Sequence, residues 1–275
     1  MPTHIDMLII GLVQGLTEFL PVSSSGHLVI FGQLLDLKSD GVALEVFVHF
    51  GTLLAVCCTF HKDIWAMLKN LTKVPKHLKA GLPNTTDDQQ SCSMTVYILI
   101  SMVPAGLVGV FLKKHIEGIY DNLYVVFSGL IFTGTVLLSL KWAKKVNKKE
   151  FMNGKNAILI GLAQALAILP GISRSGSTIT CAEWLGIKSE LAAKFSFLMS
   201  IPVIAGATIL EMRHLGAEGV SKQQILLYTT AMLSAAISGY FAIRFLMAII
   251  RKQKMEYFAY YCYAVAIVGL ILHQA

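Results

Sequence analysis

Two short polar runs interrupt long apolar stretches of this chain, and both contain residue types that bind phosphate. Their sequences are Pro21-Val22-Ser23-Ser24-Ser25-Gly26-His27 and Pro170-Gly171-Ile172-Ser173-Arg174-Ser175-Gly176-Ser177-Thr178. A short helix is predicted after each run, near 26–35 and 176–187, and the free N–H groups and positive dipole end of a helix N-terminus bind anions. Two such helix starts facing one another, with Arg174 between them, would form a phosphate or diphosphate pocket, because a guanidinium binds phosphate bidentately.

The glycines and serines of these runs have a simpler alternative role. Glycine lets the backbone adopt tight turns and serine caps helix ends, so one run alone could equally serve only to complete a helix break. Two matched runs and an arginine at membrane depth favour the binding site, since an uncompensated charge inside a membrane is costly.

A carboxylate precedes the first run. Gln14 and Glu18 are four residues apart in an apolar segment, so they share one helix face. Glu18 could hold a divalent metal ion together with Gln14, accept a proton, or form a structural ion pair with Arg174. The second apolar stretch has Gln164 but Ala167 and Ile168 where Glu18 would be. The predicted site is therefore asymmetric, whereas a chemically symmetric site would suit simple transport better.

Several side chains of the first run could supply a nucleophile or a base. His27 could act as base, acid or nucleophile, and Ser23, Ser24 and Ser25 compete with it for the nucleophile role. The spacing of these residues in the sequence does not identify the nucleophile. Four other charged residues in apolar context are interpreted as paired or snorkelling side chains: Glu45, Glu183, Lys194 and Arg244.

The composition indicates that a membrane must position these residues. Hydrophobic residues make up 55% of the 275 residues and charged ones only 14%, against about 25% in soluble domains. This excludes a disordered protein, a fibrous protein and an ordinary soluble enzyme, and it predicts an all-α polytopic membrane protein. The segments long and apolar enough to span a bilayer are 43–61, 94–112, 123–140, 191–210, 225–250 and 257–273.

Two further apolar stretches, 5–35 and 156–187, contain the polar runs at their centres. Each half is short for a span, and irregular polar backbone at membrane depth is tolerated only where protein buries it or it lines a watery cavity. We interpret both stretches as re-entrant helix hairpins that enter and leave on one side.

The basic residues predict the orientation. The loops 62–93, 141–155 and 251–256 hold 14 lysines and arginines, whereas the segments 1–42, 113–122 and 211–224 hold five. The positive-inside rule places the first group in the cytoplasm and both termini outside. The net charge of +7 then reflects basic residues gathered on the cytoplasmic side and does not indicate nucleic-acid binding. The five cysteines show neither a disulfide framework nor a CxxC pair, and the histidines show no zinc spacing.

The two hairpins are copies of one another. Gly11-Leu12-Val13-Gln14 matches Gly161-Leu162-Ala163-Gln164 at an offset of 150, and the match extends through the polar runs to Lys38 and Lys188. Three spans separate the copies, so they must enter from opposite faces. We therefore expect an inverted-topology repeat, with 1–150 as the first half and 151–275 as the second, and hairpin tips that meet inside the membrane.

The segment from Gln14 to His27 resembles the first signature, (E/Q)xxxE plus PVSSxGH, of the bacterial undecaprenyl-diphosphate phosphatases, also called the bacitracin-resistance family. The segment from Pro170 to Thr178 resembles the second signature, PGxSRSxxT. The resemblance covers the whole chain. It implies hydrolysis of undecaprenyl diphosphate to the monophosphate and phosphate, in the inner membrane, with a divalent cation (Mg²⁺, or Ca²⁺) and a possible homodimer.

The resemblance also implies site residues. Glu18 would be the essential acidic residue, Arg174 the phosphate clamp, and Ser24 or His27 the nucleophile or base. Gln14 stands where many relatives have glutamate, which weakens metal ligation by the pair. The phosphate-binding residues would be Ser23, Ser25, Gly26, Ser173, Arg174, Ser175, Gly176 and Thr178.

We expect the diphosphate head to enter from the outer face while the prenyl chain stays in lipid. Developing charge on the phosphoryl group would be neutralised by Arg174, the helix starts and the cation. A transporter or lipid flippase is the alternative, because inverted repeats with broken helices are a transporter architecture. A non-catalytic lipid-binding scaffold is a third possibility.

Overall fold

The computed structural model describes residues 2–37, 41–82, 86–143, 149–218 and 221–274. Their regular structure is helical, and within these ranges the only β-type pairing is an isolated bridge between Lys149 and Ile187. The fold class predicted from composition is therefore confirmed.

Long helices occupy all six predicted spans. In the described ranges five helices are long and apolar enough to cross a membrane, and a bent pair, 43–59 with 61–69, makes a sixth. The predicted boundaries are close to the observed ones, which are α3 (Gly41–Thr59), α6 (Asp87–Phe111), α8 (Leu123–Leu138) continued by α9 (Leu140–Ala143), α12 (Ser189–Glu218), α13 (Lys222–Arg251) and α14 (Tyr257–Gln274).

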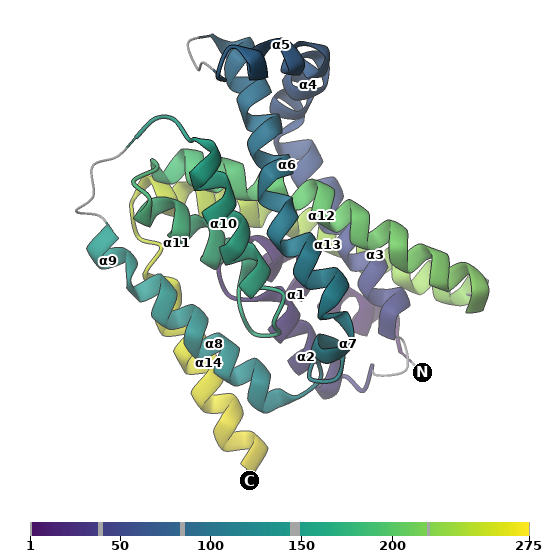
Figure 1. The fold of residues 1–275 in the computed structure, drawn as a ribbon. Helices are drawn as coiled ribbons and strands as arrows, with labels where there is room; N and C mark the ends of the chain where they lie inside the picture. Colours follow the sequence, from purple (N-terminus) through teal and green to yellow (C-terminus); the bar gives the residue numbers. More distant parts are fainter. Residues whose placement is uncertain (1, 38–40, 83–85, 144–148, 219–220, 275) are drawn as a thin grey trace.

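The two interrupted stretches form helix–break–helix units as expected. The first consists of α1 (His4–Phe19) and α2 (Ser24–Leu34), and the second of α10 (Gly154–Leu166) and α11 (Arg174–Trp184). In each unit the two helices contact one another. In Figure 1 α10 and α11 lie side by side at the left, and α1 and α2 lie at the centre of the bundle.

Short helices between the spans were not predicted. The chain turns by 78° between α3 and α4 (His61–Lys69) and continues through η1 (Leu71–Lys73) and α5 (Val74–Lys79). This segment projects at the top of Figure 1. A further short helix, α7 (Lys113–Glu117), joins α6 to α8.

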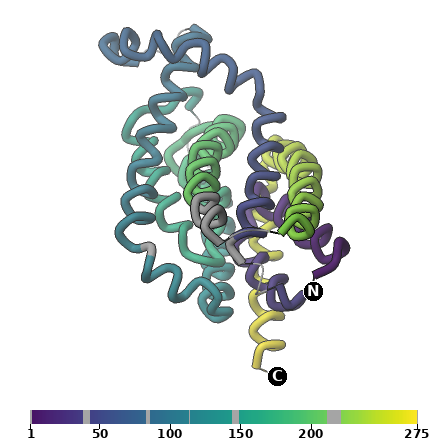
Figure 2. Tube along the Cα trace, turned by 90° about the vertical axis from the view of Figure 1, so that its right-hand side faces the viewer, coloured from purple at the N-terminus to yellow at the C-terminus, as the bar shows by residue number. Residues whose placement is uncertain are grey.

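Helices of the two halves of the chain pack on each other. α1 packs on α13, α10 packs on α6, and α3 contacts both α12 and α13, between which it lies in Figure 2. Two glycines allow close contacts between these helices. A Cβ atom on Gly11 would lie 2.2 Å from the Ala231 carbonyl oxygen, and one on Gly161 would lie 2.4 Å from that of Ser101. The absence of a side chain thus brings α1 and α10 against their partners.

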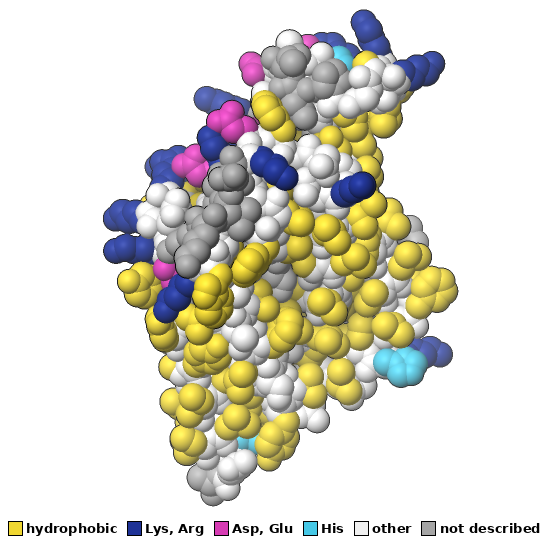
Figure 3. Space-filling model, turned by 60° about the vertical axis from the view of Figure 1, so that its left-hand side comes forward, with side chains coloured by type: hydrophobic (Ala, Val, Ile, Leu, Met, Phe, Trp, Pro, Cys, Tyr) yellow, Lys and Arg dark blue, Asp and Glu magenta, His cyan; other side chains and the backbone are white. Residues whose placement is uncertain are grey.

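One face of the molecule is apolar over the bundle and basic at one end. Figure 3 shows lysine and arginine side chains gathered at the top and upper left, above a broad hydrophobic surface. This is the distribution expected of a chain that crosses a membrane. Four of the lysines counted in the sequence lie outside the described residues: Lys38, Lys144, Lys145 and Lys148.

Candidate functional site

The tips of the two hairpins meet at the centre of the molecule. The Ser175 hydroxyl donates to the Leu20 carbonyl oxygen at 3.1 Å. A Cβ atom on Gly26 would lie 3.2 Å from the Gly171 Cα, and one on Gly176 would lie 3.3 Å from Pro21 Cβ. The expected meeting of the tips is therefore observed, and glycine at these positions allows the two loops to touch.

Equivalent serines cap the two helices that leave the tips. The Ser23 hydroxyl accepts from the Gly26 N–H at 3.3 Å, and the Ser173 hydroxyl accepts from the Gly176 N–H at 3.1 Å. Ser25 and Ser175 hydroxyls lie 3.2 Å from those of Ser23 and Ser173. The helices therefore begin at residues 24 and 174, two residues before the predicted starts. The serines do complete the helix break, while other groups of the first turns face the cavity described below.

Each loop contains a residue in the left-handed region of backbone space. Ser23 has φ 69° and Gly171 has φ 86°. A Cβ atom on Gly171 would lie 2.1 Å from the Val126 carbonyl oxygen, so no other residue fits there. Thr133 of α8 fixes this loop, since its hydroxyl donates to the Gly171 carbonyl and accepts from the Ser173 N–H.

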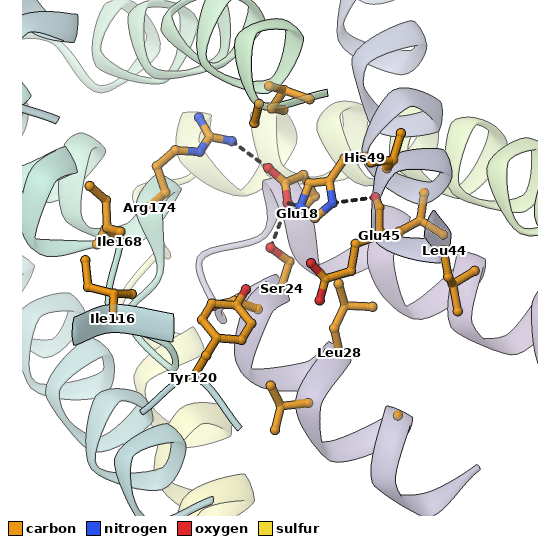
Figure 4. A pocket seen from close by; sticks show the side chains of 18 of the residues that line it. Glu18, Ser24, Leu28, Leu44, Glu45, His49, Ile116, Tyr120, Ile168 and Arg174 are labelled. Carbon is orange, nitrogen blue, oxygen red and sulfur yellow. Dashed lines mark hydrogen bonds and ion pairs between the residues drawn. The ribbon is translucent and has the colours of Figure 1, made fainter. Parts of the chain in front are cut away.

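An ion pair joins the hairpins beneath the tips. Arg174 Nη2 donates to Glu18 Oε1 at 3.1 Å, and the side chains are only 15% and 6% exposed. Arg174 Nη1 also donates to the Ser196 carbonyl oxygen at 3.2 Å. Of the roles weighed for Glu18, pairing with Arg174 is thus present in the structure (Figure 4).

The second carboxylate oxygen of Glu18 accepts hydrogen bonds from polar side chains of its own hairpin. Ser24 Oγ donates to Glu18 Oε2 at 2.7 Å, and Gln14 Nε2 donates to the same atom at 3.0 Å. His49 Nε2 of α3 lies 3.9 Å from it. Glu18 therefore links a hydroxyl that could become a nucleophile to the cation that could bind a phosphate.

His27 lies away from this carboxylate. Its Nδ1 is 2.8 Å from the Ser23 carbonyl oxygen, and its Nε2 is 2.8 Å from the Tyr261 hydroxyl. The imidazole is buried and stacks on the Tyr261 ring of α14. These contacts hold the loop to α14, and Ser24 rather than His27 is the residue in contact with Glu18.

Thr178 supports Arg174 from behind. Its hydroxyl donates to the Arg174 carbonyl oxygen at 2.8 Å and lies 2.7 Å from the Ser196 hydroxyl. Since the Ser196 carbonyl accepts from the guanidinium, Thr178 and Ser196 together fix the position of the arginine.

A cavity of about 870 Å³ opens over the ion pair. The predicted residues that line it are Glu18, Ser24, Ser25, Ser173 and Arg174. The remaining predicted residues lie behind this lining: Gln14, Ser23, Gly26, His27, Ser175, Gly176 and Thr178.

The cavity wall includes residues that sequence reasoning did not place in the site. His49 and Glu45 come from α3, and Tyr120 comes from the loop before α8; in Figure 4 all three face Ser24 and Glu18. Tyr120 also interacts through its hydroxyl with Ser25. The i, i+4 spacing of Glu45 and His49 was visible in the sequence, whereas Tyr120 carried no signal.

The rest of the wall is apolar. Leucine, isoleucine and valine side chains extend from the ion pair toward the faces of α2, α7 and α12, and include Leu28, Leu44, Ile116, Ile168, Val203 and Ile204. The cavity therefore combines a polar floor with a hydrophobic wall. This combination fits a ligand with a charged head and an apolar chain.

The residues present do not fit a divalent cation held by Gln14 and Glu18. Both Glu18 oxygens already accept from cationic or polar donors, and Arg174 places a positive charge beside them. Gln14 Oε1 is buried without a hydrogen-bond partner, but it is a single ligand atom. Within the described ranges, histidine, cysteine and acidic side chains form no group of three that could hold a metal.

Comparison with known proteins places the chain among named relatives. The family model described as bacitracin resistance protein BacA matches residues 7–268. An undecaprenyl-diphosphatase of Korarchaeum cryptofilum is 40% identical over 96% of this chain and 97% of its own length. Similar proteins of the same name occur in Halothermothrix orenii, at 37% identity over 97% and 96%, and in Methanobrevibacter smithii, at 39% over 98% of both chains.

Proposed function

Because the chain belongs to the bacitracin resistance protein family, we propose that it hydrolyses undecaprenyl diphosphate to undecaprenyl phosphate and inorganic phosphate. This reaction recycles the lipid carrier for cell-wall synthesis and confers bacitracin resistance. The observation that supports it best is the Ser24–Glu18–Arg174 chain on the floor of a half-apolar cavity.

The two ends of the substrate match the two parts of the cavity. The diphosphate lies against Arg174 and the first turns of α2 and α11, where backbone dipoles and the guanidinium favour negative charge. The prenyl chain follows the apolar wall toward lipid. We propose that, on binding, Arg174 exchanges its contact with Glu18 for one with a phosphate oxygen.

Ser24 is our proposed nucleophile, because its hydroxyl already donates to a carboxylate. Glu18 takes the Ser24 proton as the oxygen attacks the terminal phosphorus. The bond from that phosphorus to the bridging oxygen breaks, and undecaprenyl phosphate leaves. Glu18 passes that proton to the departing oxygen of undecaprenyl phosphate and is a carboxylate again. It then takes a proton from water, whose oxygen attacks the phosphoserine. The bond from phosphorus to Ser24 Oγ breaks, inorganic phosphate leaves, and Glu18 returns the proton to Ser24 Oγ. Throughout, Arg174 stabilises the charge on the transferring group.

A divalent cation remains part of the proposal, although the Gln14–Glu18 pair does not fit one. A diphosphate carries several negative charges, and Arg174 is the arginine that lines the cavity where we place it. We therefore propose that Mg²⁺ or Ca²⁺ would accompany the substrate and supply further charge neutralisation.

The test is phosphate release from a polyprenyl diphosphate by the purified protein in detergent, where no transmembrane gradient exists. A transporter or a binding scaffold would release no phosphate. Arg174→Ala should lower kcat/KM by at least about a hundredfold, since preorganised donors to a developing charge contribute on that scale.

Arg244→Ala is the matched control for this substitution. Arg244 is an exposed arginine on α13 whose guanidinium donates to Tyr240, and it lies outside the cavity lining. Its loss should leave the rate unchanged. Full activity of folded Arg174→Ala protein would refute the assignment of the site.

A further inference from the structure

The segment that follows the bend after α3 has a composition suited to a membrane surface. We define it as the projecting segment, residues 61–82, which comprises α4, η1 and α5. If α3 crosses the bilayer, the 78° turn at Phe60 places α4 nearly parallel to the membrane plane. Amphipathic helices in this orientation bury an apolar face at the level of the lipid headgroups.

The side chains of α4 divide around its axis. At 100° per residue, the apolar residues Met67, Ile64, Leu68 and Trp65 follow one another over a single arc, and Lys69 and Lys62 border it beside Trp65. Ile64 and Met67 pack against the protein core. Leu68 and Trp65 continue the same arc outward and are 59% and 70% exposed.

The rest of the projecting segment repeats this combination. Leu71 and Leu78 are about half exposed. Lys76 and Lys79 are also exposed, and residues 61–82 contain five lysines against one acidic residue, Asp63.

Contacts on the inner side fix the orientation of these residues. Asp88 of α6 accepts from Asn70 and forms an ion pair with Lys73. Asp63 is paired with Lys194 of α12. Asp63 and Asp88 are thus each paired with a lysine, and the exposed Trp65 and Leu68 lie on the arc of α4 that Lys62 and Lys69 border.

From this arrangement we propose that the projecting segment docks on an anionic lipid surface. Trp65, Leu68, Leu71 and Leu78 enter the interface between headgroups and acyl chains. The lysines lie at headgroup level, where a negative surface attracts them. The proposal concerns a surface remote from the cavity and does not depend on the reaction.

The experiment uses the full chain with Trp65 as its single tryptophan, in the background Trp142→Phe/Trp184→Phe. The helical circular dichroism signal and its cooperative loss on heating serve as the check of folding. The protein is reconstituted into phosphatidylcholine vesicles with or without phosphatidylglycerol, and emission is recorded with brominated lipids and with aqueous iodide. We expect a blue-shifted emission that brominated lipids quench, more strongly in the anionic vesicles and less at high salt.

A charge variant and its control distinguish the effect of the lysines on α4 from that of lysines elsewhere in the protein. Lys62→Gln/Lys69→Gln should weaken quenching by brominated lipid in anionic vesicles. Lys252→Gln/Lys254→Gln removes the same charge from the exposed loop after α13 and should leave Trp65 unaffected.

Three results would overturn the proposal. Trp65 quenched by iodide as freely as a small tryptophan derivative would place the segment in water. Equal lipid quenching in neutral and anionic vesicles would mean that the segment inserts through its apolar residues alone, without attraction to anionic lipid. Quenching that disappears as the protein-to-lipid ratio rises would indicate that a second copy of the chain covers this surface.

Discussion

The carboxylate of Glu18 accepts from three side chains, and each of them bears on a different part of the proposed reaction. Ser24 would lose its proton to it, Arg174 is released by it to the substrate, and Gln14 orients it. Two of these residues, Gln14 and Ser24, lie within six positions of Glu18, so their proximity to it could be inferred from the sequence. The contact with Arg174 spans 156 positions and was foreseeable only through the matched runs.

Glu18→Gln tests the proton-acceptor role. The amide keeps the size of the side chain but cannot accept a proton from Ser24, so kcat should fall by at least about a hundredfold. KM should not rise, because the substrate no longer competes with a carboxylate for Arg174. Steady-state phosphate release measures both constants. Glu190→Gln, at an exposed glutamate paired with Arg251, is the control. A raised KM with unchanged kcat would contradict the role.

Tyr120→Phe tests whether the cavity wall contributes to substrate binding. The variant removes only the hydroxyl near Ser25. A neutral hydrogen bond contributes about 0.5–1.5 kcal/mol, so KM should rise by about two- to tenfold with little change in kcat. Tyr124→Phe, on the exposed face of α8, should show no effect. The same KM for both variants would place Tyr120 outside the binding site.

His49 and Tyr120 show why part of the site could not be predicted. They reach the cavity because α3 and the loop before α8 pack beside the hairpins. Neither residue lies near a polar run in the sequence. Their place depends on tertiary packing, which apolar periodicity alone does not specify.

Among the helices, the hairpins and spans were predictable because composition and length identify them. The predicted short helices began two residues late, since the capping roles of Ser23 and Ser173 were not assigned. The bend after α3 was missed because no proline or glycine marks it: Thr59-Phe60-His61 contains neither. We propose, from the pairing of α1 with α13 and of α10 with α6, that 1–150 and 151–275 are interlocked repeats.

Gly161→Ala tests the close packing of α10 on α6. Its methyl group would lie 2.4 Å from the Ser101 carbonyl oxygen, so the helices must separate, at a cost of about 1–3 kcal/mol. The melting temperature in detergent, followed by tryptophan fluorescence, should fall. Gly106→Ala is the control, because nothing lies within 4 Å of its Cβ position and alanine favours the helix. Equal melting temperatures for the Gly161→Ala and Gly106→Ala variants would mean that the close approach of α10 to α6 does not affect stability.

For the whole molecule, the many exposed apolar side chains, the helices long enough to span a bilayer and the basic end are those of a multi-pass membrane protein. We propose that it resides in the bacterial inner membrane with both termini and the cavity mouth outside. Homodimerisation remains a prediction, which chemical cross-linking in membranes would test.

Epitope tags test the proposed orientation. A tag after Ala275 should bind antibody on intact spheroplasts, because the C-terminus is expected outside. A tag inserted between Lys252 and Gln253 should bind only after permeabilisation. Both should be accessible in permeabilised cells, which is the control for tag exposure. The reverse pattern would invert the topology and the side to which the cavity opens.

The ion pair between the hairpins also bears on turnover. In the resting protein the guanidinium of Arg174 is already occupied by the Glu18 carboxylate. If Arg174 binds phosphate as we propose, inorganic phosphate left after hydrolysis would compete with that internal carboxylate, which is tethered and always present. End-product inhibition by phosphate should therefore be weak, and a cell rich in phosphate would not stall its carrier lipid at this step.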